Sequence, residues 1–295
     1  MSRLLPLVRS LPRQKALLAF IAILLLYGAY VYWRSLQDYV STDDAYVGAH
    51  VVSMAAQVAG PVDRLFVHDN EAVHAGERLF EIDPHPYKIA VRAAEASVEQ
   101  RQALLTNAEA ISGRTRRMAA HRFLSSQASE TAQATVKADQ AALAAAQAAA
   151  ARAKLNLAHC LVRAPTDGYL SNMRLRPGAY IQAGTPLFAL IASHTYWVTA
   201  NFKETDLSHI AVGDRAHVHI DMYSNHLFHG KVIGISGGSG TAFSLLPPEN
   251  ATGNWVKVTQ RVPVRILILD PSPRWPLRIG TSADATVFFH KAHRR

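Results

Sequence analysis

The sequence predicts a mainly β fold that is interrupted by an α-helical hairpin and preceded by a transmembrane helix. Three observations lead to this fold class: residues 58–82 recur at 166–190, a long alanine-rich stretch separates the two copies, and short strand patterns follow the second copy. We therefore expect a split β sandwich, an antiparallel two-helix coiled coil inserted between its halves, and a small C-terminal β barrel.

The first predicted element is a membrane span at residues 16–33, ALLAFIAILLLYGAYVYW, which carry no charge. At 1.5 Å per residue this run covers roughly 27 Å, enough to cross a bilayer. Basic residues precede it and acidic residues follow, so we expect the N-terminus in the cytoplasm and the bulk of the chain outside. A cleaved signal peptide is the alternative, but Tyr27-Gly28-Ala29-Tyr30 does not provide small residues at the −3 and −1 positions of a cleavage site.

The remaining segments follow from the positions of the repeat. A first strand at Tyr46 to Val52 leads from the membrane span into the first copy. The predicted order is residues 1–15 (cytoplasmic), 16–33 (transmembrane helix), 34–50 (linker and first barrel strand), 51–83 (first sandwich half), 84–160 (helical hairpin), 161–191 (second half), 192–289 (β barrel) and 290–295 (tail).

The two copies of the repeat align without a gap when the first is shifted by 108 positions, and both end in Ala-Gly-x-x-Leu-Phe. Their short apolar runs punctuated by glycine are typical of strands joined by tight turns, where glycine supplies a positive φ. A few dozen residues cannot bury a core alone, so the copies must face each other. The expected turn glycines are Gly60 and Gly76 with their counterparts Gly168 and Gly184.

Between the copies, Tyr87 to Cys160 contains no proline and is rich in alanine, which favours helix. One helix of that length would exceed roughly 100 Å, so we expect a turn near residues 124–126, where serine is a favoured N-cap. Two series of residues spaced seven apart pair about residue 124 and predict an antiparallel seam. The seam residues are Val91, Val98 and Leu105 on the first arm and Val136, Leu143, Ala150 and Leu157 on the second.

The return to β structure begins at Pro165, which makes continued helix unfavourable. A short helix is expected at Glu204 to Ile210. Strand patterns separated by turns rich in glycine, proline and asparagine predict the barrel. These patterns cover Trp197 to Phe202, Ala216 to Ile220, Gly230 to Ile235, Val262 to Leu269 and Ala283 to Phe289.

The paired repeats resemble the biotinyl/lipoyl domain, a flattened sandwich of two similar halves. Enzyme carriers of that fold hold a modified lysine at the turn between the halves. Here Asp83-Pro84-His85-Pro86 follows the first half instead, without a lysine. A biotin or lipoyl carrier is therefore the less favoured hypothesis, and we expect no cofactor.

Four further stretches, two of which overlap, resemble HlyD-type membrane fusion proteins, also called periplasmic adaptors, and in particular their EmrA-like branch. They are the opening segment TDDAYV (42–47), the barrel segment ANFKETDL (200–207) and the overlapping pair FSLLPPENATGNW (243–255) and GNWVKVTQRVPVRI (253–266). The resemblance implies a single-pass adaptor of the bacterial inner membrane that belongs to a tripartite multidrug or small-molecule efflux pump and is not an enzyme.

The resemblance also implies the partners: an inner-membrane exporter of the major facilitator superfamily, a TolC-like outer-membrane channel, and further copies of the chain in a trimer or hexamer. The family recognises the channel through an Arg, Leu and Ser at a fixed spacing in the hairpin tip, which Arg114, Met118 and Ser125 match with Met in place of Leu. An adaptor of an ABC secretion system and an aromatic-acid efflux adaptor remain as alternatives.

Other chemistry is not favoured. The charge of +9 is spread along the chain without a nucleic-acid motif, so no nucleic-acid binding is expected. Among fourteen histidines, His217 and His219 share a strand face and His226 and His229 follow, but without a cysteine pair or an HExxH motif we expect no metal. No Gly-x-Ser-x-Gly motif is present, we expect no catalytic residue, and Cys160 is interpreted as a packing residue.

Overall fold

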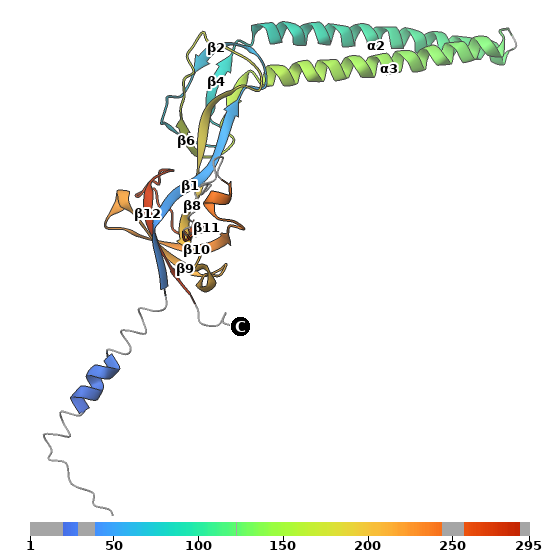
Figure 1. Cartoon of the computed structure of the whole chain (residues 1–295). Helices are drawn as coiled ribbons and strands as arrows, with labels where there is room; N and C mark the ends of the chain where they lie inside the picture. The colour runs from blue at the N-terminus through green and yellow to red at the C-terminus, as the bar shows by residue number, and fades with distance from the viewer. Residues whose placement is uncertain (1–19, 29–38, 122, 244–256, 290–295) are drawn as a thin grey trace, which may run out of the picture. The chain divides into compact units, whose positions relative to one another are not determined.

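The structure, a computed structural model, describes residues 20–28, 39–121, 123–243 and 257–289 (Figure 1). It divides into two compact units. One contains the residues up to Ala49 and those from Thr195 onward, and the other contains His50–His194. Strands β1 (Tyr39–Ala55) and β8 (Pro186–Lys203) cross this boundary, so each contributes to both units.

The second unit holds a β sandwich built from the two copies of the repeat. Its short strands are β2 (Gly60–Leu65), β3 (Ala72–Val73), β4 (Arg78–Ile82), β5 (Leu161–Arg163), β6 (Gly168–Ser171) and β7 (Tyr180–Ile181). One sheet has the order β5-β4-β2-β7, and in the other β6 pairs with β3 and with the first part of β8. The predicted split sandwich is therefore present.

Strand pairing in the sandwich follows the repeat. Strand β2 pairs with β7 through Gly60 and Ile181, and β6 pairs with β3 through their counterparts Gly168 and Val73. Equivalent residues of the two copies therefore form equivalent strand pairs. This arrangement gives the sandwich an approximate two-fold symmetry.

The two copies bury a shared apolar core. Phe80 and Phe188 occupy equivalent positions of the repeat, and their ring centroids lie 6.0 Å apart in an edge-to-face arrangement. Both side chains are buried, as are Leu79, Leu170 and Leu190. The stretches 58–82 and 166–190 therefore close against one another, as the sequence predicted.

The repeat glycines serve two different purposes. Gly76 and Gly184 have φ values of 82° and 81°, a conformation that favours glycine. Gly168 does not have a positive φ; a Cβ atom there would lie 2.3 Å from the carbonyl oxygen of Ile191. The close approach of a neighbouring strand therefore requires glycine at this position, and the sequence-based reason was wrong for it.

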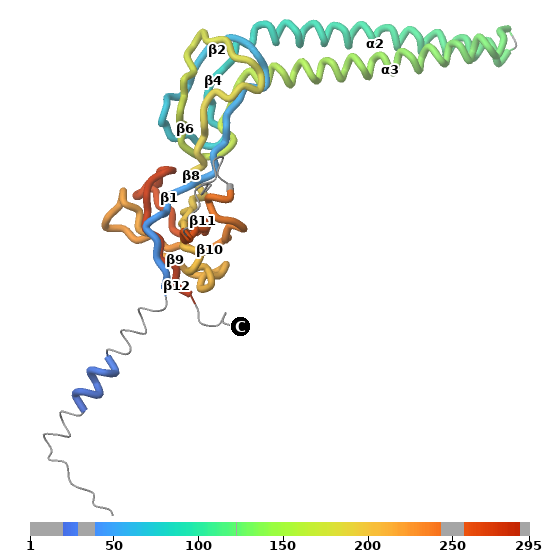
Figure 2. Tube along the Cα trace, viewed as in Figure 1, coloured from blue at the N-terminus to red at the C-terminus, as the bar shows by residue number. Residues whose placement is uncertain are grey.

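Two long helices, α2 (His85–Ala120) and α3 (Ser126–Ala158), form an antiparallel hairpin (Figure 2). The first begins directly after β4, and the second ends just before β5. Because Glu81 of β4 pairs with Leu161 of β5, both ends of the hairpin start from adjacent strands of one sheet. At the standard rise each helix is roughly 50 Å long.

The seam between the helices is thinner than the heptad pattern suggests. Among the predicted seam residues, Val91, Leu105, Leu143 and Ala150 are buried. The other three, Val98, Val136 and Leu157, are only half-buried. Ala108, which the pattern did not include, is also buried. Two helices alone enclose only part of each seam side chain, which accounts for Val98 and Val136. Leu157 instead packs against the core of the sandwich.

The first unit is a β barrel with the strand order β1-β12-β9-β10-β11-β8, and an additional β1–β8 pairing closes the ring. Its strand β1 is longer than the predicted strand, and a 3₁₀ turn at Leu207–His209 replaces the predicted short helix. The strands not yet given are β9 (Arg215–Ile220), β10 (Leu227–Ile235), β11 (Arg261–Ile268) and β12 (Ser282–Phe288).

Half of the predicted membrane span lies outside the described residues. Within residues 16–33, only 20–28 are described, and they are helical with exposed apolar side chains such as Phe20 and Leu26. Among the residues that the structure describes, no helix is both long and apolar enough to cross a membrane.

Candidate functional site

The hairpin tip brings two of the three predicted docking residues onto one face. Arg114 and Met118 lie one helical turn apart on α2, both are exposed, and residues four apart share a helix face. The α2 helix ends in a turn in which the Phe123 N–H donates a 3.0 Å hydrogen bond to the Met118 carbonyl. The tip therefore presents a cation beside an apolar side chain.

Ser125 has a structural role of its own at this tip. It is the N-cap of α3, and its hydroxyl accepts a 3.3 Å hydrogen bond from the Ala128 N–H. In the described part of the chain, no hydrogen bond joins Ser125 to Arg114. The three residues of the predicted motif thus lie at one end of the hairpin, but Ser125 belongs to the turn rather than to the face of α2.

Two large apolar side chains are exposed at the turn of the hairpin, where the sequence predicted a turn but no binding residue of this kind. Phe123 is 75% exposed and Leu124 is 39% exposed, which is costly for large apolar side chains unless a partner covers them. Leu124 also lines a groove of about 570 Å³ between the ends of the two helices. The other lining residues are Ile111, Thr115, Ser125, Gln127, Ala128, Thr131, Ala132 and Thr135.

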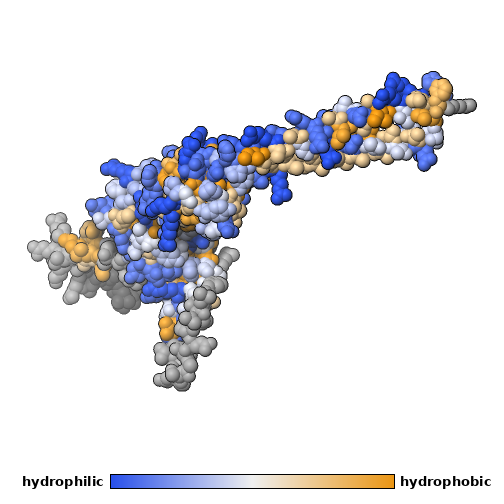
Figure 3. All heavy atoms as spheres, turned by 90° about the horizontal axis from the view of Figure 1, so that it is seen from above, coloured by the Kyte–Doolittle hydropathy of each residue, from blue (hydrophilic) through white to orange (hydrophobic). Residues whose placement is uncertain are grey.

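The surface of the hairpin, coloured by hydropathy, also carries apolar side chains among hydrophilic ones. Figure 3 shows apolar patches along the visible face of the hairpin, next to strongly hydrophilic residues. Three exposed apolar residues of α2, Leu104, Ile111 and Met118, follow one another at intervals of seven. Such a stripe is typical of a helix that packs against another helix.

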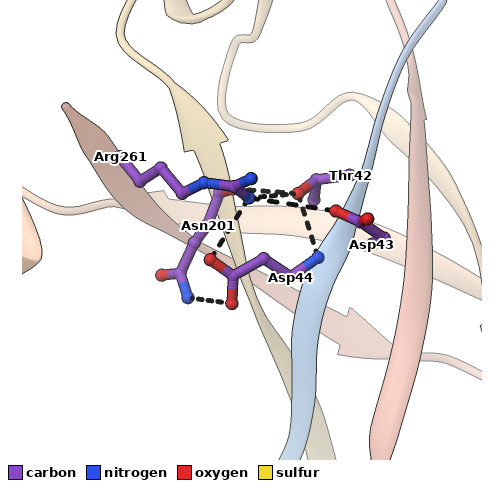
Figure 4. A network of polar contacts seen from close by, with 5 residues as sticks. All are labelled: Thr42, Asp43, Asp44, Asn201 and Arg261. Atoms are coloured by element: carbon purple, nitrogen blue, oxygen red, sulfur yellow. Dashed lines mark hydrogen bonds and ion pairs between the residues drawn. The ribbon is translucent and has the colours of Figure 1, made fainter. Parts of the chain in front are cut away.

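A polar network joins three strands of the barrel (Figure 4). The Arg261 guanidinium of β11 lies 3.2 Å from the Asp44 carboxylate of β1, and the Asn201 side-chain amide of β8 donates a 3.0 Å hydrogen bond to the same carboxylate. The Thr42 hydroxyl, which is buried, donates to the Asn201 carbonyl at 2.9 Å. A break in the β1–β12 register falls between Thr42 and Ala45, where a bulge re-aims the side chains.

The residues of this network come from three of the stretches that were identified in the sequence. Thr42 and Asp44 belong to TDDAYV, Asn201 to ANFKETDL and Arg261 to GNWVKVTQRVPVRI. Residues 244–256, which contain most of the remaining stretch, lie outside the described residues. We call this set of Thr42, Asp43, Asp44, Asn201 and Arg261 the barrel clasp. Beside it lies a cleft of about 590 Å³ lined by Ser41, Thr42, Asp43, Lys203, Asp206, Arg261, Asp284 and Thr286.

Comparison with known proteins agrees with this architecture. Residues 50–193 match the family described as RND MFP, barrel-sandwich hybrid domain, and residues 195–290 match the AAEA-like β-barrel domain. The chain is 35% identical to the multidrug export protein EmrA of Haemophilus influenzae, over 93% of this chain and 84% of that protein. The chain belongs to the membrane fusion protein family.

Two further comparisons extend over similar lengths. The multidrug resistance protein MdtN of Escherichia coli K12 is 32% identical over 95% of this membrane fusion protein and 98% of its own length. The solved structure of the membrane fusion protein Spr0693 from Streptococcus pneumoniae R6 aligns with a TM-score of 0.62 at 16% identity, covering 85% of this chain and 99% of that one. The second match shows a shared fold.

In this membrane fusion protein the four histidines that were considered for metal binding do not all converge, although the rings of His217 and His229 lie 5.4 Å apart. His226 stacks on Trp275 with ring centroids 5.2 Å apart, and His229 contacts Asp270 through Nδ1 at 3.0 Å. The ring centroid of His217 lies 4.7 Å from that of Phe288. These side chains have aromatic or carboxylate partners and do not form one coordination sphere.

Cys160 lies in the core of the sandwich and is a free thiol. Burial, together with the neighbouring carboxylates of Asp83 and Glu81, raises the pKa of this thiol to about 11. Since the thiolate is the nucleophile, a thiol with this pKa is unreactive at neutral pH. This property agrees with a packing role.

The barrel clasp gives a testable prediction. In the Arg261→Met variant Asp44 loses its cation, so we expect the barrel to melt a few degrees below wild type by circular dichroism. The difference should shrink at high salt, because the clasp is partly exposed and screened. Arg215→Met, which alters an exposed arginine of β9, is the control and should melt like wild type. Equal melting of both variants would contradict a stabilising clasp.

Proposed function

We propose that this chain is the periplasmic adaptor of a tripartite efflux pump for drugs or other small molecules. It would connect an inner-membrane exporter of the major facilitator type to a TolC-like outer-membrane channel. The observation that carries the proposal is similarity along nearly the whole chain to proteins named for multidrug export. The sandwich, barrel and hairpin provide the parts that a connecting protein needs.

The proposed mechanism is mechanical rather than chemical. A hairpin whose two ends start from paired strands of a sandwich is a stiff extension of that sandwich. Its tip presents exposed apolar and basic groups to a partner, as a docking surface requires. Residues 16–33 are proposed to anchor the chain in the inner membrane as a single span, with the sandwich and barrel in the periplasm.

Several copies are proposed to act together as a trimer or hexamer. The exposed stripe of Leu104, Ile111 and Met118 on α2 supports side-by-side contact between hairpins, because its spacing of seven suits helix packing. A closed ring of adaptors would enclose a conduit between the exporter and the channel.

Two experiments test this function. Deleting the gene should raise susceptibility to a subset of compounds in a drug panel, and expression of the chain in the deletion strain should restore tolerance. Co-purification should recover a many-helix exporter without an ATPase domain. Recovery of an ABC transporter would favour the alternative of a polypeptide-secretion adaptor and contradict the proposed exporter class.

A second candidate is an adaptor for aromatic-acid efflux, one of the alternatives that the sequence left open. The same drug panel separates the two, if aromatic acids are included. Hypersensitivity of the deletion strain to aromatic acids alone would support this second candidate over multidrug export.

The tip gives another prediction. Arg114→Glu reverses the charge beside Met118, so we expect normal folding and exporter association but reduced crosslinking to the outer-membrane channel. Arg101→Glu, an exposed arginine of α2 more than three turns from Arg114, is the matched control and should crosslink like wild type. Crosslinking that survives Arg114→Glu undiminished would show that the channel does not bind at this face.

A further inference from the structure

The barrel carries a polar cluster that the proposed function does not use. His219 lies on β9, Asp221 follows it two residues later, and Asp284 of β12 is the register partner of His219. One ring nitrogen of His219 and one carboxylate oxygen of each aspartate lie within 4.8 Å of one another. The imidazole is half-buried and both carboxylates are exposed.

A residue outside the cluster orients the imidazole of His219. Its Nε2 lies 2.9 Å from the backbone carbonyl oxygen of Ser224. Because a carbonyl oxygen can only accept, Nε2 carries the proton and Nδ1 of the neutral ring keeps its lone pair. Histidines that ligate metals usually donate their other N–H to a carbonyl or carboxylate in this way. The ring is thus held in a tautomer whose Nδ1 is available to a metal ion.

Neither carboxylate of the cluster is in an ion pair among the described residues, although Asp284 lines the same cleft as Lys203 and Arg261. In the described part of the chain, no lysine or arginine forms an ion pair with Asp221 or Asp284, whereas Arg261 lies 3.2 Å from Asp44 in the barrel clasp. Two negative charges held this close repel each other. A divalent cation between them would turn that repulsion into attraction.

We infer that His219, Asp221 and Asp284 bind a divalent cation of the zinc class. One imidazole nitrogen and two carboxylate oxygens are ligands that zinc accepts, and three protein ligands leave a position for water. The bound ion joins β9 and the turn after it to β12 and holds this side of the barrel together. Only His219 belongs to the group of histidines considered from the sequence, which lacked the two aspartates.

The test is calorimetric titration of the purified full-length chain with zinc chloride in a buffer without chelators. Wild type is expected to bind one zinc ion per chain at a tight site, and zinc should raise its melting temperature. Asp284→Asn, which keeps the shape of the side chain, and His219→Ala should each weaken binding by at least about tenfold. The folding of each variant is checked by circular dichroism without metal.

The matched control is His229→Ala, which removes a barrel histidine that contacts Asp270 and is not a member of the cluster. It should bind zinc like wild type. Titration with cobalt adds a spectroscopic check, because its visible absorption reports the coordination of the ion. The inference is overturned if wild type shows no tight site or if Asp284→Asn binds zinc with wild-type affinity. Loss of the site in His229→Ala would also overturn it by placing the ion elsewhere.

Discussion

Replacing Phe80 with alanine is expected to destabilise the sandwich unit by about 3–5 kcal/mol, the usual cost of removing a large buried aromatic side chain. Phe80 is fully buried, and its ring meets that of Phe188 from the other copy of the repeat. The substitution therefore removes a contact between the two halves on which both ends of the hairpin are based. Urea unfolding followed by far-ultraviolet circular dichroism measures the loss.

The repeat supplies the controls for this experiment. Phe188→Ala should cost a similar amount, and a double-mutant cycle should show coupling of about 0.5–1.5 kcal/mol between the two rings. Tyr180→Ala removes an aromatic side chain of the same unit that is 68% exposed, so it should change stability by less than about 0.5 kcal/mol. Equal effects of Phe80→Ala and Tyr180→Ala would contradict a core shared by both halves.

Local patterns predicted the elements of this fold better than their contacts. The repeat predicted that the halves pair, because its apolar residues and glycines recur with one spacing. Heptads predicted the direction of the hairpin but not Ala108, since alanine occurs on every face of both helices and gives little hydrophobic contrast. The full length of β1 depends on pairing with β12 at the other end of the chain, which no local pattern contains.

The candidate sites likewise depend on contacts between residues far apart in the sequence, which local patterns do not predict. Asn201 and Asp44 are hydrogen-bonded although they are 157 positions apart, so the barrel clasp follows only from the tertiary structure. His219 and Asp221 are only two positions apart in the sequence, at the end of β9 and in the turn that follows it, but Asp284 joins them through strand pairing. At the tip, by contrast, Arg114 and Met118 are neighbours through helix periodicity alone, and the sequence was sufficient.

A charge in the hairpin seam is expected to abolish efflux. Leu143 is 9% exposed on α3, and its predicted partner across the seam, Leu105, is 6% exposed. Leu143→Asp removes buried apolar area worth about 2–5 kcal/mol and places an unpaired carboxylate between the helices. A seam this thin has few other contacts to compensate, so the helices should separate near this position. Reduced helical circular dichroism and faster hydrogen exchange in α2 and α3 would measure the change.

The matched control for Leu143→Asp is Leu155→Asp, because Leu155 lies on the same helix but is 55% exposed. That variant introduces the same charge without loss of burial, so its hairpin should remain helical and stable. In a deletion strain it should restore drug tolerance, whereas Leu143→Asp should not. If Leu143→Asp kept both its helicity and full drug tolerance, an intact seam would not be needed for transport. Since the hairpin is the part proposed to reach the outer channel, that result would also remove the mechanical basis of the adaptor mechanism.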